Sequence, residues 1–362
     1  MTILPHSVRL LHEYCAAYHL CACRSVKSRE ERVMIKFEAP RVWLAPMSGA
    51  TDAPMRRQAV RFGAPAVVSE MVAGEMLAKA RADVVRRTCR HDGGGYWIVQ
   101  LAARRPEDML AGAALVADAG VDVIDINMGC PSKQVTGGQS GSALMRDLGL
   151  AGEIIDAAIE GAGGRPVTLK MRLGWDDANL NAPELGRMAQ DKGVQMLTVH
   201  GRSRCQFYTG AANWRAVRDT VEAVSVPVIV NGDIHDAASA RKALDQSGAH
   251  GVMVGRAAMG RPWLVGEISA AIEGRRWRKP LLAEQFDSLA EQVADAQALY
   301  GPNLGLRMVR KHVSAAIEHL DFPMADAERR TLRADLCRIE RPAELVRALK
   351  AVYLKRTHEE LV

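Results

Sequence analysis

The chain has 362 residues, with 48 Lys and Arg against 42 Asp and Glu, 48% hydrophobic residues and 5% aromatic residues. This apolar content is that of an ordinary globular protein, which excludes a disordered chain and a small disulfide-stapled scaffold. No apolar run reaches the roughly 18 residues of a membrane-spanning helix, so we expect no membrane association. For this length we expect one large domain and a smaller one.

The N-terminal segment, residues 1–33, lacks a small-residue cleavage pattern behind a basic start, so it does not read as a signal peptide. Met34 offers an alternative start, and we expect the segment to lie outside the folded body. Cys15, Cys21 and Cys23 have no fourth ligand at zinc spacing, so we reject a metal site there. Seven scattered cysteines, an odd number, indicate reduced thiols and a cytoplasmic protein.

Eight short apolar or β-branched runs, each followed by an amphipathic stretch, begin at residue 42. Strands that are buried on both faces lose their polar alternation, so these runs predict a parallel sheet covered by helices. Eight such units within residues 34–282 favour a (β/α)8 TIM barrel, which typically has about 250 residues, over a doubly wound open sheet. The predicted strands are 42–47, 66–71, 97–101, 123–127, 167–172, 196–200, 226–231 and 251–255.

The strand pattern ends before a basic, Pro-terminated segment, residues 274–280, which we interpret as an interdomain connection. Beyond it, four amphipathic stretches predict a small C-terminal helical bundle of residues 283–362. Residues 301–356 contain 12 Lys and Arg against 7 Asp and Glu, an excess that favours an anionic partner, although a solvated helix face explains it equally well. The predicted helices are 282–300, 304–320, 325–337 and 343–356.

Polar residues and glycines occupy the carboxyl ends of the predicted strands, where the active sites of barrels lie. A buried polar group without a partner costs about 1–3 kcal/mol, so their presence at five strand ends indicates convergence on a polar ligand. Glycines after strands seven and eight fall where barrels commonly bind phosphate, and no Walker or dinucleotide motif is present, which favours a mononucleotide cofactor. These residues are Gln100, Asn127, Lys170, His200, Asn231, Gly232, Gly255 and Arg256.

Six motifs together resemble the FMN-dependent tRNA-dihydrouridine synthases, and among these the DusB-like branch. The resemblance runs from about Val42 to Arg356, and the set of motifs is specific although each one alone is weak. The motifs are Pro46-Met47 with Thr51-Asp52, Asp-Ile-Asn-Met-Gly-Cys-Pro at 125–131, Lys-Met-Arg at 170–172, Val-His-Gly-Arg at 199–202, Asn-Gly-Asp-Ile at 231–234 and Val-Gly-Arg-Ala at 254–257.

The resemblance implies an enzyme that reduces the C5–C6 double bond of a D-loop uridine in tRNA, with FMN as cofactor and NADPH as electron donor. Reduced FMN would pass a hydride to C6, Cys130 would protonate C5, and Asn127 would contact the uracil. Ser48 stands where the family leads us to expect alanine. The implied cofactor contacts are Pro46, Met47, Ser48, Gln100, Lys170, His200, Asn231, Gly232, Asp233, Gly255 and Arg256.

Elementary chemistry agrees with these roles. A thiol with the ordinary pKa of about 8.5 is mainly protonated near neutral pH, so Cys130 can donate a proton. The ammonium group of Lys170 would stabilise the negative charge of a reduced flavin. The alternatives are an inert structural cysteine, an ion pair of Lys170 inside the barrel and a core role for His200, while the role of Arg172 stays open.

The resemblance also implies that the C-terminal helices bind tRNA, with Arg310, Lys311 and His312 as contacts on one helix face together with Arg307. A target uridine must be unstacked at a cost of a few kcal/mol, which contacts to the RNA backbone would offset. We expect a monomer without an obligate protein partner. Two other functions stay open: an FMN barrel dehydrogenase of a free small molecule, similar to the dihydroorotate type, and a non-catalytic RNA-binding regulatory barrel.

Overall fold

The computed structural model describes residues 37–79, 81–91 and 93–359. The predicted N-terminal extension, residues 1–33, lies outside the described residues, and so do Cys15, Cys21 and Cys23. The four cysteines in the described part of the chain, Cys89, Cys130, Cys205 and Cys337, are free thiols. None of the described helices combines the length and the apolar character that crossing a membrane requires.

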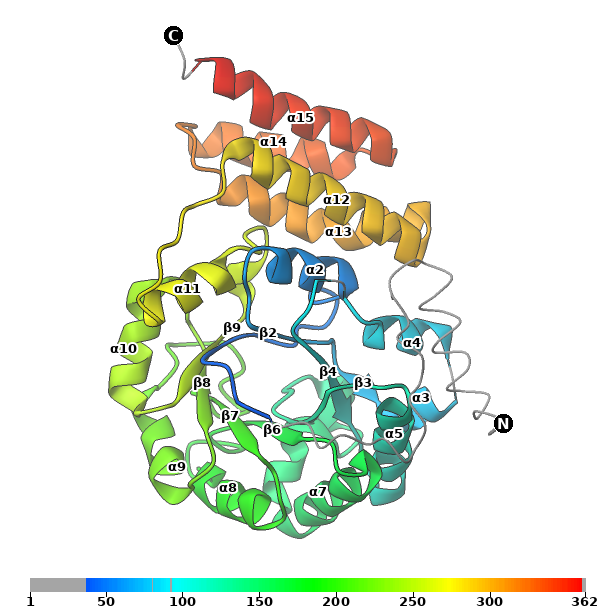
Figure 1. The fold of residues 1–362 in the computed structure, drawn as a ribbon, viewed down its shortest axis with the longest axis vertical. Helices are drawn as coiled ribbons and strands as arrows, with labels where there is room; N and C mark the ends of the chain where they lie inside the picture. The colour runs from blue at the N-terminus through cyan, green and yellow to red at the C-terminus, as the bar shows by residue number, and fades with distance from the viewer. Residues whose placement is uncertain (1–36, 80, 92, 360–362) are drawn as a thin grey trace.

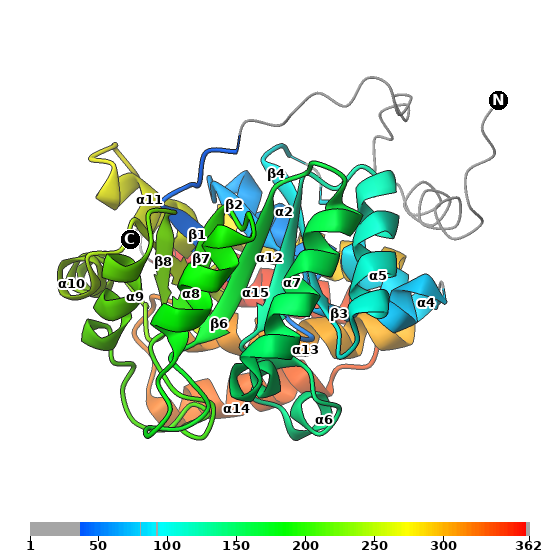
Figure 2. The ribbon, with the colours of Figure 1, turned by 90° about the horizontal axis from the view of Figure 1, so that it is seen from below.

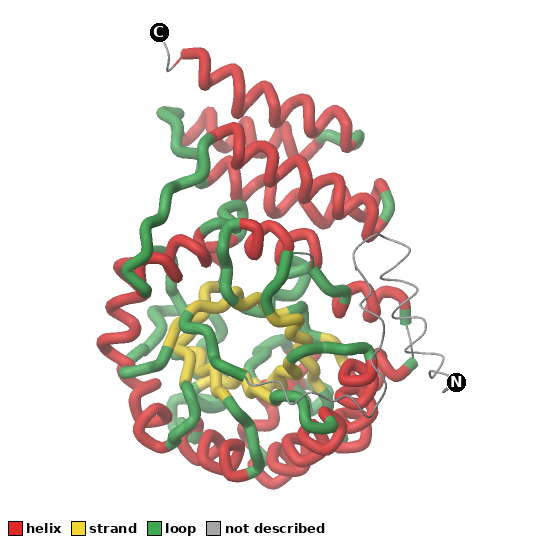
Figure 3. Tube along the Cα trace, viewed as in Figure 1, coloured by secondary structure: helices red, strands yellow, loops and turns green. Residues whose placement is uncertain are grey.

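Eight parallel strands form a closed barrel (Figures 1 and 3). The barrel closes because β2 pairs with both β1 and β4, which confirms the predicted TIM barrel and rules out the open sheet. A short strand that was not predicted, β3 (Val72–Ala73), pairs with the end of β4. The barrel strands are β1 (Val42–Leu44), β2 (Ala66–Val68), β4 (Tyr96–Ala102), β5 (Val123–Met128), β6 (Val167–Arg172), β7 (Met196–His200), β8 (Val228–Asn231) and β9 (Gly251–Val254).

Helices surround the ring of strands on its outer side, as Figure 3 shows. Local signals fix their ends: the carboxylate of Asp236 accepts a hydrogen bond from the Ser239 N–H at the start of α10, and Gly248 ends this helix with a left-handed backbone. The helices are α2 (Ala53–Arg61), α3 (Gly74–Ala78), α4 (Ala82–Thr88), α5 (Pro106–Asp118), α6 (Lys133–Thr136), α7 (Leu148–Ala162), α8 (Ala182–Asp191), α9 (Arg218–Ala223), α10 (Ala237–Ser247) and α11 (Leu264–Ile272).

The interior of the barrel changes from apolar to polar along the strands. Trp43, Ile98 and Met253 belong to an apolar cluster inside the barrel, and a larger cluster packs the outer face of the sheet against the helices. Because residues i and i+2 of a strand point to the same face, the change is visible within β5, where Val123 is followed by Asp125 and Asn127. The polar side chains of neighbouring strands therefore converge at the carboxyl end of the barrel.

The C-terminal region consists of four helices with a hydrophobic core of their own, and they stack beside the barrel (Figures 1 and 2). Each predicted helix is present, with ends that differ by at most three residues from the expected ones. The connection from the barrel runs over residues 273–281, and its basic residues Arg275, Arg278 and Lys279 form ion pairs with nearby carboxylates. The helices are α12 (Leu282–Tyr300), α13 (Pro302–Glu318), α14 (Asp326–Arg338) and α15 (Pro342–Glu359).

Polar contacts join the helical region to α2 and to the loop that precedes it. Arg57 forms an ion pair with Asp295 at 2.6 Å, and Arg61 forms one with Glu291 at 2.7 Å. The hydroxyl group of Tyr300, the last residue of α12, donates to Oδ2 of Asp52 at 3.2 Å. The helical region therefore contacts the segment that directly follows the first barrel strand.

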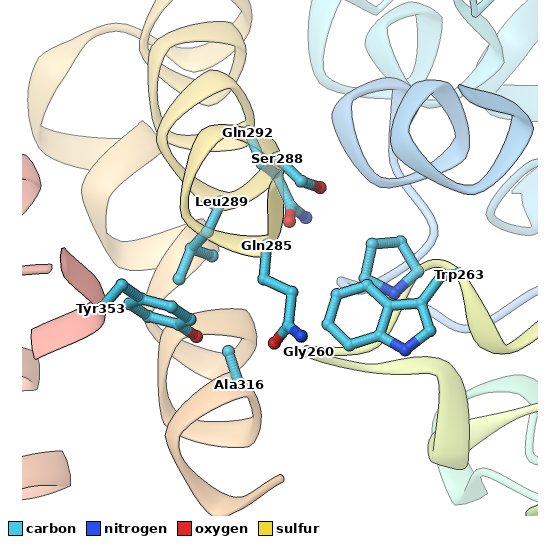
Figure 4. Close-up of a pocket in the computed structure, with 9 residues that line it drawn as sticks. Gly260, Trp263, Gln285, Ser288, Leu289, Gln292, Ala316 and Tyr353 are labelled. Atoms are coloured by element: carbon cyan, nitrogen blue, oxygen red, sulfur yellow. The ribbon is translucent and has the colours of Figure 1, made fainter. Parts of the chain in front are cut away.

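A small cleft marks a second contact between the two regions. Trp263 and Gly260 line it from the barrel side, and Gln285, Ser288 and Tyr353 line it from the helical side (Figure 4). Gly260 has a φ of 69°, and a Cβ atom on it would lie 2.2 Å from the backbone nitrogen of Ala316 in α13. Only glycine allows this approach, so the loop after β9 packs directly on α13.

The buried carboxyl group at this junction makes stability depend on pH. Burial, together with the nearby carboxylate of Glu70, raises the pKa of Asp52 from 3.8 to about 7. Between about pH 4 and pH 7 the folded protein therefore binds one proton more than the unfolded chain. The stability that Asp52 contributes in its protonated form is lost as the pH rises through this window.

We predict that Asp52→Asn, which keeps an oxygen for the Met55 N–H but cannot ionise, gains stability relative to the wild type between about pH 4 and pH 7. A shift of one pKa unit corresponds to about 1.4 kcal/mol, so the gain should amount to a few kcal/mol. Urea unfolding of both proteins across this range measures it. A difference that stays constant with pH would contradict the prediction.

Candidate functional site

A chain of side-chain hydrogen bonds crosses the polar end of the barrel. It begins at Asp125 in β5, whose Oδ1 accepts from the Thr168 hydroxyl at 2.7 Å and whose Oδ2 accepts from Nε2 of Gln100 at 2.6 Å. Nδ2 of Asn127 then donates to Oε1 of Gln100 at 2.7 Å. Burial raises the pKa of Asp125 to about 6, and the bonds from Thr168 and Gln100 oppose this shift. Gln100 and Asn127 therefore meet inside the barrel.

The loop after β5 positions Cys130 at the end of this chain. Oδ1 of Asn127 accepts from the backbone N–H of Cys130 at 3.0 Å, and the Ser142 hydroxyl donates to the Cys130 carbonyl at 2.8 Å. Nε of Arg172 donates to the carbonyl of Gly129 at 2.9 Å. Arg172, whose role the sequence left open, thus helps to hold the loop that carries Cys130. Cys130 itself is partly exposed. The thiol is thus carried by a firmly held loop and is not sealed in the apolar core.

Lys170 lies inside the barrel on β6 and is only 9% exposed. Its Nζ donates to Oδ1 of Asn231 at 3.1 Å, while Nδ2 of Asn231 donates to the carbonyl of Met253 at 2.8 Å. Burial, and then the charge of Arg172, lower the pKa of Lys170 to about 8, which leaves most of it protonated near neutral pH. Among the ion pairs of the described residues, none involves Lys170, so the alternative of a direct carboxylate partner is not realised.

A buried hydroxyl group lies beside Lys170. Thr198 of β7 pairs with Lys170 in the strand register, and its Oγ1 has no hydrogen-bond partner within the described part of the chain. A buried polar atom of this kind normally has a partner, so the free hydroxyl next to the lysine indicates a place for a polar ligand.

His200 ends β7 and lies against the glycine that follows β8. Gly232 has a φ of 113°, and a Cβ atom on it would lie 2.8 Å from Cδ2 of His200. Burial and then the charge of Lys170 lower the pKa of His200 well below its usual range, so its ring is neutral at pH 7. Nη1 of Arg202 lies 3.3 Å from Nε2 of His200, and because arginine can only donate, Nε2 is the accepting nitrogen.

Two arginines surround the carboxylate of Asp233. Arg202 donates to Oδ2 at 2.6 Å, the N–H of Ala212 donates to the same oxygen at 2.8 Å, and Arg256 lies 3.8 Å from Oδ1. The sequence analysis assigned no role to Arg202. Its place in the Val-His-Gly-Arg motif, two residues after His200, is the signal that could have indicated one. The backbone of Asp233 has a φ of 53°, an uncommon value that this network holds in place.

Aromatic and basic side chains form the rim of the barrel beyond β6 and β7. The ring of Tyr208 is 53% exposed and lies between the guanidinium groups of Arg172, at 5.6 Å, and Arg256, at 4.9 Å. Arg204 similarly lies over Trp175, at 4.5 Å from the ring centre. These rim residues were missed because their contacts join loops that are distant in the sequence.

The loop between β1 and α2 closes the opposite part of the rim. The N–H of Met47 donates to the Thr51 hydroxyl at 2.8 Å, and the Glu70 carboxylate accepts from the N–H of Gly49. Pro46 and Met47 are half-buried and Ser48 is exposed. Met47 and the glycine after β9, Gly255, approach each other, since a Cβ atom on Gly255 would lie 3.9 Å from the Met47 sulfur.

The basic residues predicted on one face of α13 have different surroundings. Lys311 donates from Nζ to the carbonyl of Gly49 in the β1–α2 loop, and Arg310 donates to the carbonyl of Ile339 at 3.2 Å. His312 is 2% exposed, so, contrary to the prediction, it does not share an exposed face with Arg307. With about 3.6 residues per turn, five positions place His312 roughly 140° around the helix from Arg307, so the helical period itself separates these two residues.

Most of the chain is similar to proteins of one known family. The family model described as "Dihydrouridine synthase (Dus)" matches residues 43–356. A probable tRNA-dihydrouridine synthase of Rhodobacter capsulatus is 49% identical, over 88% of this chain and 96% of that protein. A probable tRNA-dihydrouridine synthase of Rickettsia conorii is 47% identical, over 75% and 82%. The tRNA-dihydrouridine synthase B of Pseudomonas putida is 44% identical, over 75% and 80%. The chain therefore belongs to the dihydrouridine synthase family, whose members are flavin-dependent oxidoreductases that act on tRNA.

Proposed function

We propose that this protein reduces the C5–C6 double bond of a D-loop uridine in tRNA to 5,6-dihydrouridine, with FMN as the bound cofactor and NADPH as the electron donor. The observation that carries the proposal is the arrangement at the carboxyl end of the barrel. There Asn127 holds the loop of a partly exposed cysteine, Cys130. The next two strands of the barrel carry a buried lysine and a buried hydroxyl group that has no hydrogen-bond partner among the described residues.

The polar residues inside the barrel fit the ring of a flavin. Lys170 and Gln100 would hydrogen-bond the ring, His200 would help to hold it, and the Thr198 hydroxyl is available to the same ligand. The half-buried Pro46 and Met47 with the exposed Ser48 would line the cofactor from the β1–α2 loop. A protonated Lys170 in this buried position favours a ring that carries negative charge.

The residues after β8 and β9 fit a ribityl phosphate. Gly232 lies so close to His200 that a side chain could not be accommodated, and its backbone N–H would be the group offered to the phosphate. Gly255 and Arg256 follow the neighbouring strand, and Asn231 connects this part of the site to Lys170. Asp233 would contribute through its backbone, since Arg202 engages its carboxylate and a phosphate would repel it.

In the proposed reaction, a flavin held by these residues would supply the hydride for C6 of the uracil. Cys130 supplies the proton for C5: its S–H bond breaks, a C–H bond forms, and the thiolate that is left takes a proton from solvent. Asn127 would contact the uracil while it holds the cysteine loop through the backbone. Preorganisation of the thiol by Asn127, Ser142 and Arg172 reduces the entropy lost on reaching the reactive geometry.

The barrel, residues 34–282, would be the catalytic domain, and the helical region, residues 283–362, would bind tRNA as part of a monomer. Its excess of basic residues supports this assignment, with Arg310 and Lys311 as contacts. Lys311 also reaches the carbonyl of Gly49, so a phosphate that binds it would lie next to the β1–α2 loop.

The test of the function is to incubate the purified protein with FMN, NADPH and an unmodified tRNA transcript. We expect the protein to be yellow, and mass spectrometry of the digested RNA should find one uridine with two added hydrogens. Free uridine and orotate serve as parallel substrates. Turnover of the free bases alone would favour the small-molecule dehydrogenase, and RNA binding without turnover would favour the regulatory barrel.

Replacement of the proposed proton donor should abolish turnover but not cofactor binding. We predict that Cys130→Ala lowers the rate of dihydrouridine formation by about 10²–10⁴-fold, the usual contribution of a positioned acid, with the flavin content unchanged. Cys205→Ala, at an exposed free cysteine, is the matched control and should keep the wild-type rate. Equal rates for the two variants would remove the assigned role of Cys130.

Replacement of Gly232 should prevent cofactor binding. We predict that Gly232→Ala yields folded but colourless protein, because the added methyl group would collide with His200 and the positive φ disfavours alanine. Gly164→Ala is the control: Gly164 also has a positive φ, 88° against 113° at Gly232, but a Cβ atom on it would meet no neighbour within 4 Å. The control should therefore retain flavin absorbance. A yellow Gly232→Ala protein would contradict the proposed phosphate site.

A further inference from the structure

Alternating arginine and aromatic side chains connect three loops at the carboxyl end of the barrel. The Cζ atom of Arg146 lies 4.8 Å from the ring centre of Trp175, and that of Arg204 lies 4.5 Å from the same ring centre. Arg204 also lies 4.9 Å from the ring centre of Phe207. Arg146 precedes α7, Trp175 follows β6, and Arg204 and Phe207 follow β7. We call these four residues the rim cluster.

The rim cluster is joined to the loop that carries Cys130. Nη2 of Arg204 donates to the hydroxyl group of Thr136 at 3.3 Å, and Thr136 ends α6, the short helix that follows Cys130. The backbone N–H of Arg204 donates to the carbonyl of Gly174 at 2.9 Å, which joins the loops after β7 and β6. A polymer that presents a base to Cys130 would therefore pass close to the rim cluster.

The two arginines of the rim cluster carry positive charges without a carboxylate partner. In the described part of the chain, neither Arg146 nor Arg204 forms an ion pair, and the side chain of Arg146 makes no hydrogen bond. Nε of Arg204 is buried and has no hydrogen-bond partner among the described residues. Aspartates follow in the same loops, but they accept hydrogen bonds from other groups: Asp147 from the Leu150 N–H, Asp176 from the Ala178 N–H and Asp177 from the Ser203 hydroxyl.

The helical region offers its basic groups on different terms. Arg310 and Lys311, the residues proposed to contact RNA, already donate to the carbonyls of Ile339 and Gly49. A phosphate that binds either side chain must compete with these hydrogen bonds. At the exposed Arg146 no such bond has to be given up, so a phosphate gains the full contact there.

The geometry of the rim cluster suits phosphate groups better than bases. A guanidinium group that stacks on an aromatic ring is held in place, while its N–H groups, which lie in its own plane, stay available at the edge. A phosphate can accept two of them in a bidentate contact. Because two guanidinium groups lie over the ring of Trp175, this ring has little surface left for stacking on a base.

We propose that the rim cluster is an RNA-binding surface on the barrel itself, where Arg146 and Arg204 hold the phosphates of nucleotides next to the one that enters the site. The inference rests on the proposed function, because it takes RNA as the partner. It adds a surface that contacts only the backbone of the strand, separate from the helical region and from the uracil contact at Asn127.

NADPH also carries phosphate groups and would approach the same end of the barrel. The exposed position of Arg146, with its outward edge free, favours a strand that continues over the rim of the barrel. The experiments below are therefore designed for RNA, and binding of the electron donor is one of the outcomes that would overturn the proposal.

The first experiment measures the Kd of the FMN-loaded protein for an unmodified tRNA transcript over a series of salt concentrations. We expect the double variant Arg146→Gln, Arg204→Gln to raise Kd by about tenfold and to lower the slope of log Kd against log salt by about one to two, since each lost phosphate contact removes about one. Arg187→Gln is the matched control, because Arg187 is exposed on α8 and has no ion pair within the described ranges. It should keep both values. An unchanged slope in the double variant would overturn the proposal.

The second experiment distinguishes phosphate binding from a purely structural role of the cation–π contacts. Arg204→Lys keeps the charge, so it should restore the salt slope that Arg204→Gln loses. Equal losses in the two variants would show that the arginine only braces the loops. If the variants at Arg204 do not fold, Arg146→Gln provides the test, since its exposed side chain makes no hydrogen bond among the described residues. A wild-type Kd and slope for Arg146→Gln would then refute the proposal.

The outcomes separate this inference from the function on which it rests. A wild type that binds the transcript but forms no dihydrouridine refutes the proposed function, while the Kd values and slopes still decide the role of the rim cluster. A wild type that does not bind the transcript refutes both. If the double variant keeps its Kd for tRNA but its flavin is reduced more slowly by NADPH, the rim cluster serves the electron donor and the proposal fails.

Discussion

The structure depends on the need to pair polar groups that the closure of the barrel buries. Apolar side chains fill one half of the barrel interior and polar side chains fill the other. The polar half has little access to water. Asp125, Gln100 and Asn127 satisfy one another in a chain, and Lys170 is satisfied by Asn231. Few alternative arrangements of these groups avoid an unpaired donor or acceptor, so the strands hold the site in one geometry.

A second constraint links the site to the helical region. The β1–α2 loop, which would line the flavin, is held by Glu70, which follows β2, and by Lys311 of α13, both through Gly49. Tyr300 adds a bond to Asp52 at the start of α2. The region proposed to bind RNA and the loop proposed to contact the cofactor are therefore joined at Gly49, so a displacement of α13 relative to the barrel would change the contacts of this residue.

The sequence predicted the barrel and the helical region well because both depend on local periodicity and on apolar content. It predicted which strand ends carry polar groups, but not how these groups pair. Asp125 was noted only as part of a sequence motif. Its hydrogen bonds could not be predicted because its partners, Gln100 and Thr168, lie on two other strands. Arg202 was missed for the same reason. His312 was misplaced because it was grouped with its neighbours Arg310 and Lys311, although the turn of the helix carries it away from the face of Arg307 and into the protein.

Positive charges outnumber negative ones among the buried side chains at the mouth of the barrel. Lys170, Arg172 and Arg202 are buried there, and burial lowers the pKa of Lys170 and that of Arg172. Asp125 and Asp233 offset only part of this charge, and His200 stays neutral. A site that keeps an excess of positive charge away from water is stabilised by an anionic ligand. A phosphate-bearing flavin whose reduced ring is negative meets this requirement, whereas a neutral base alone would leave the excess uncompensated.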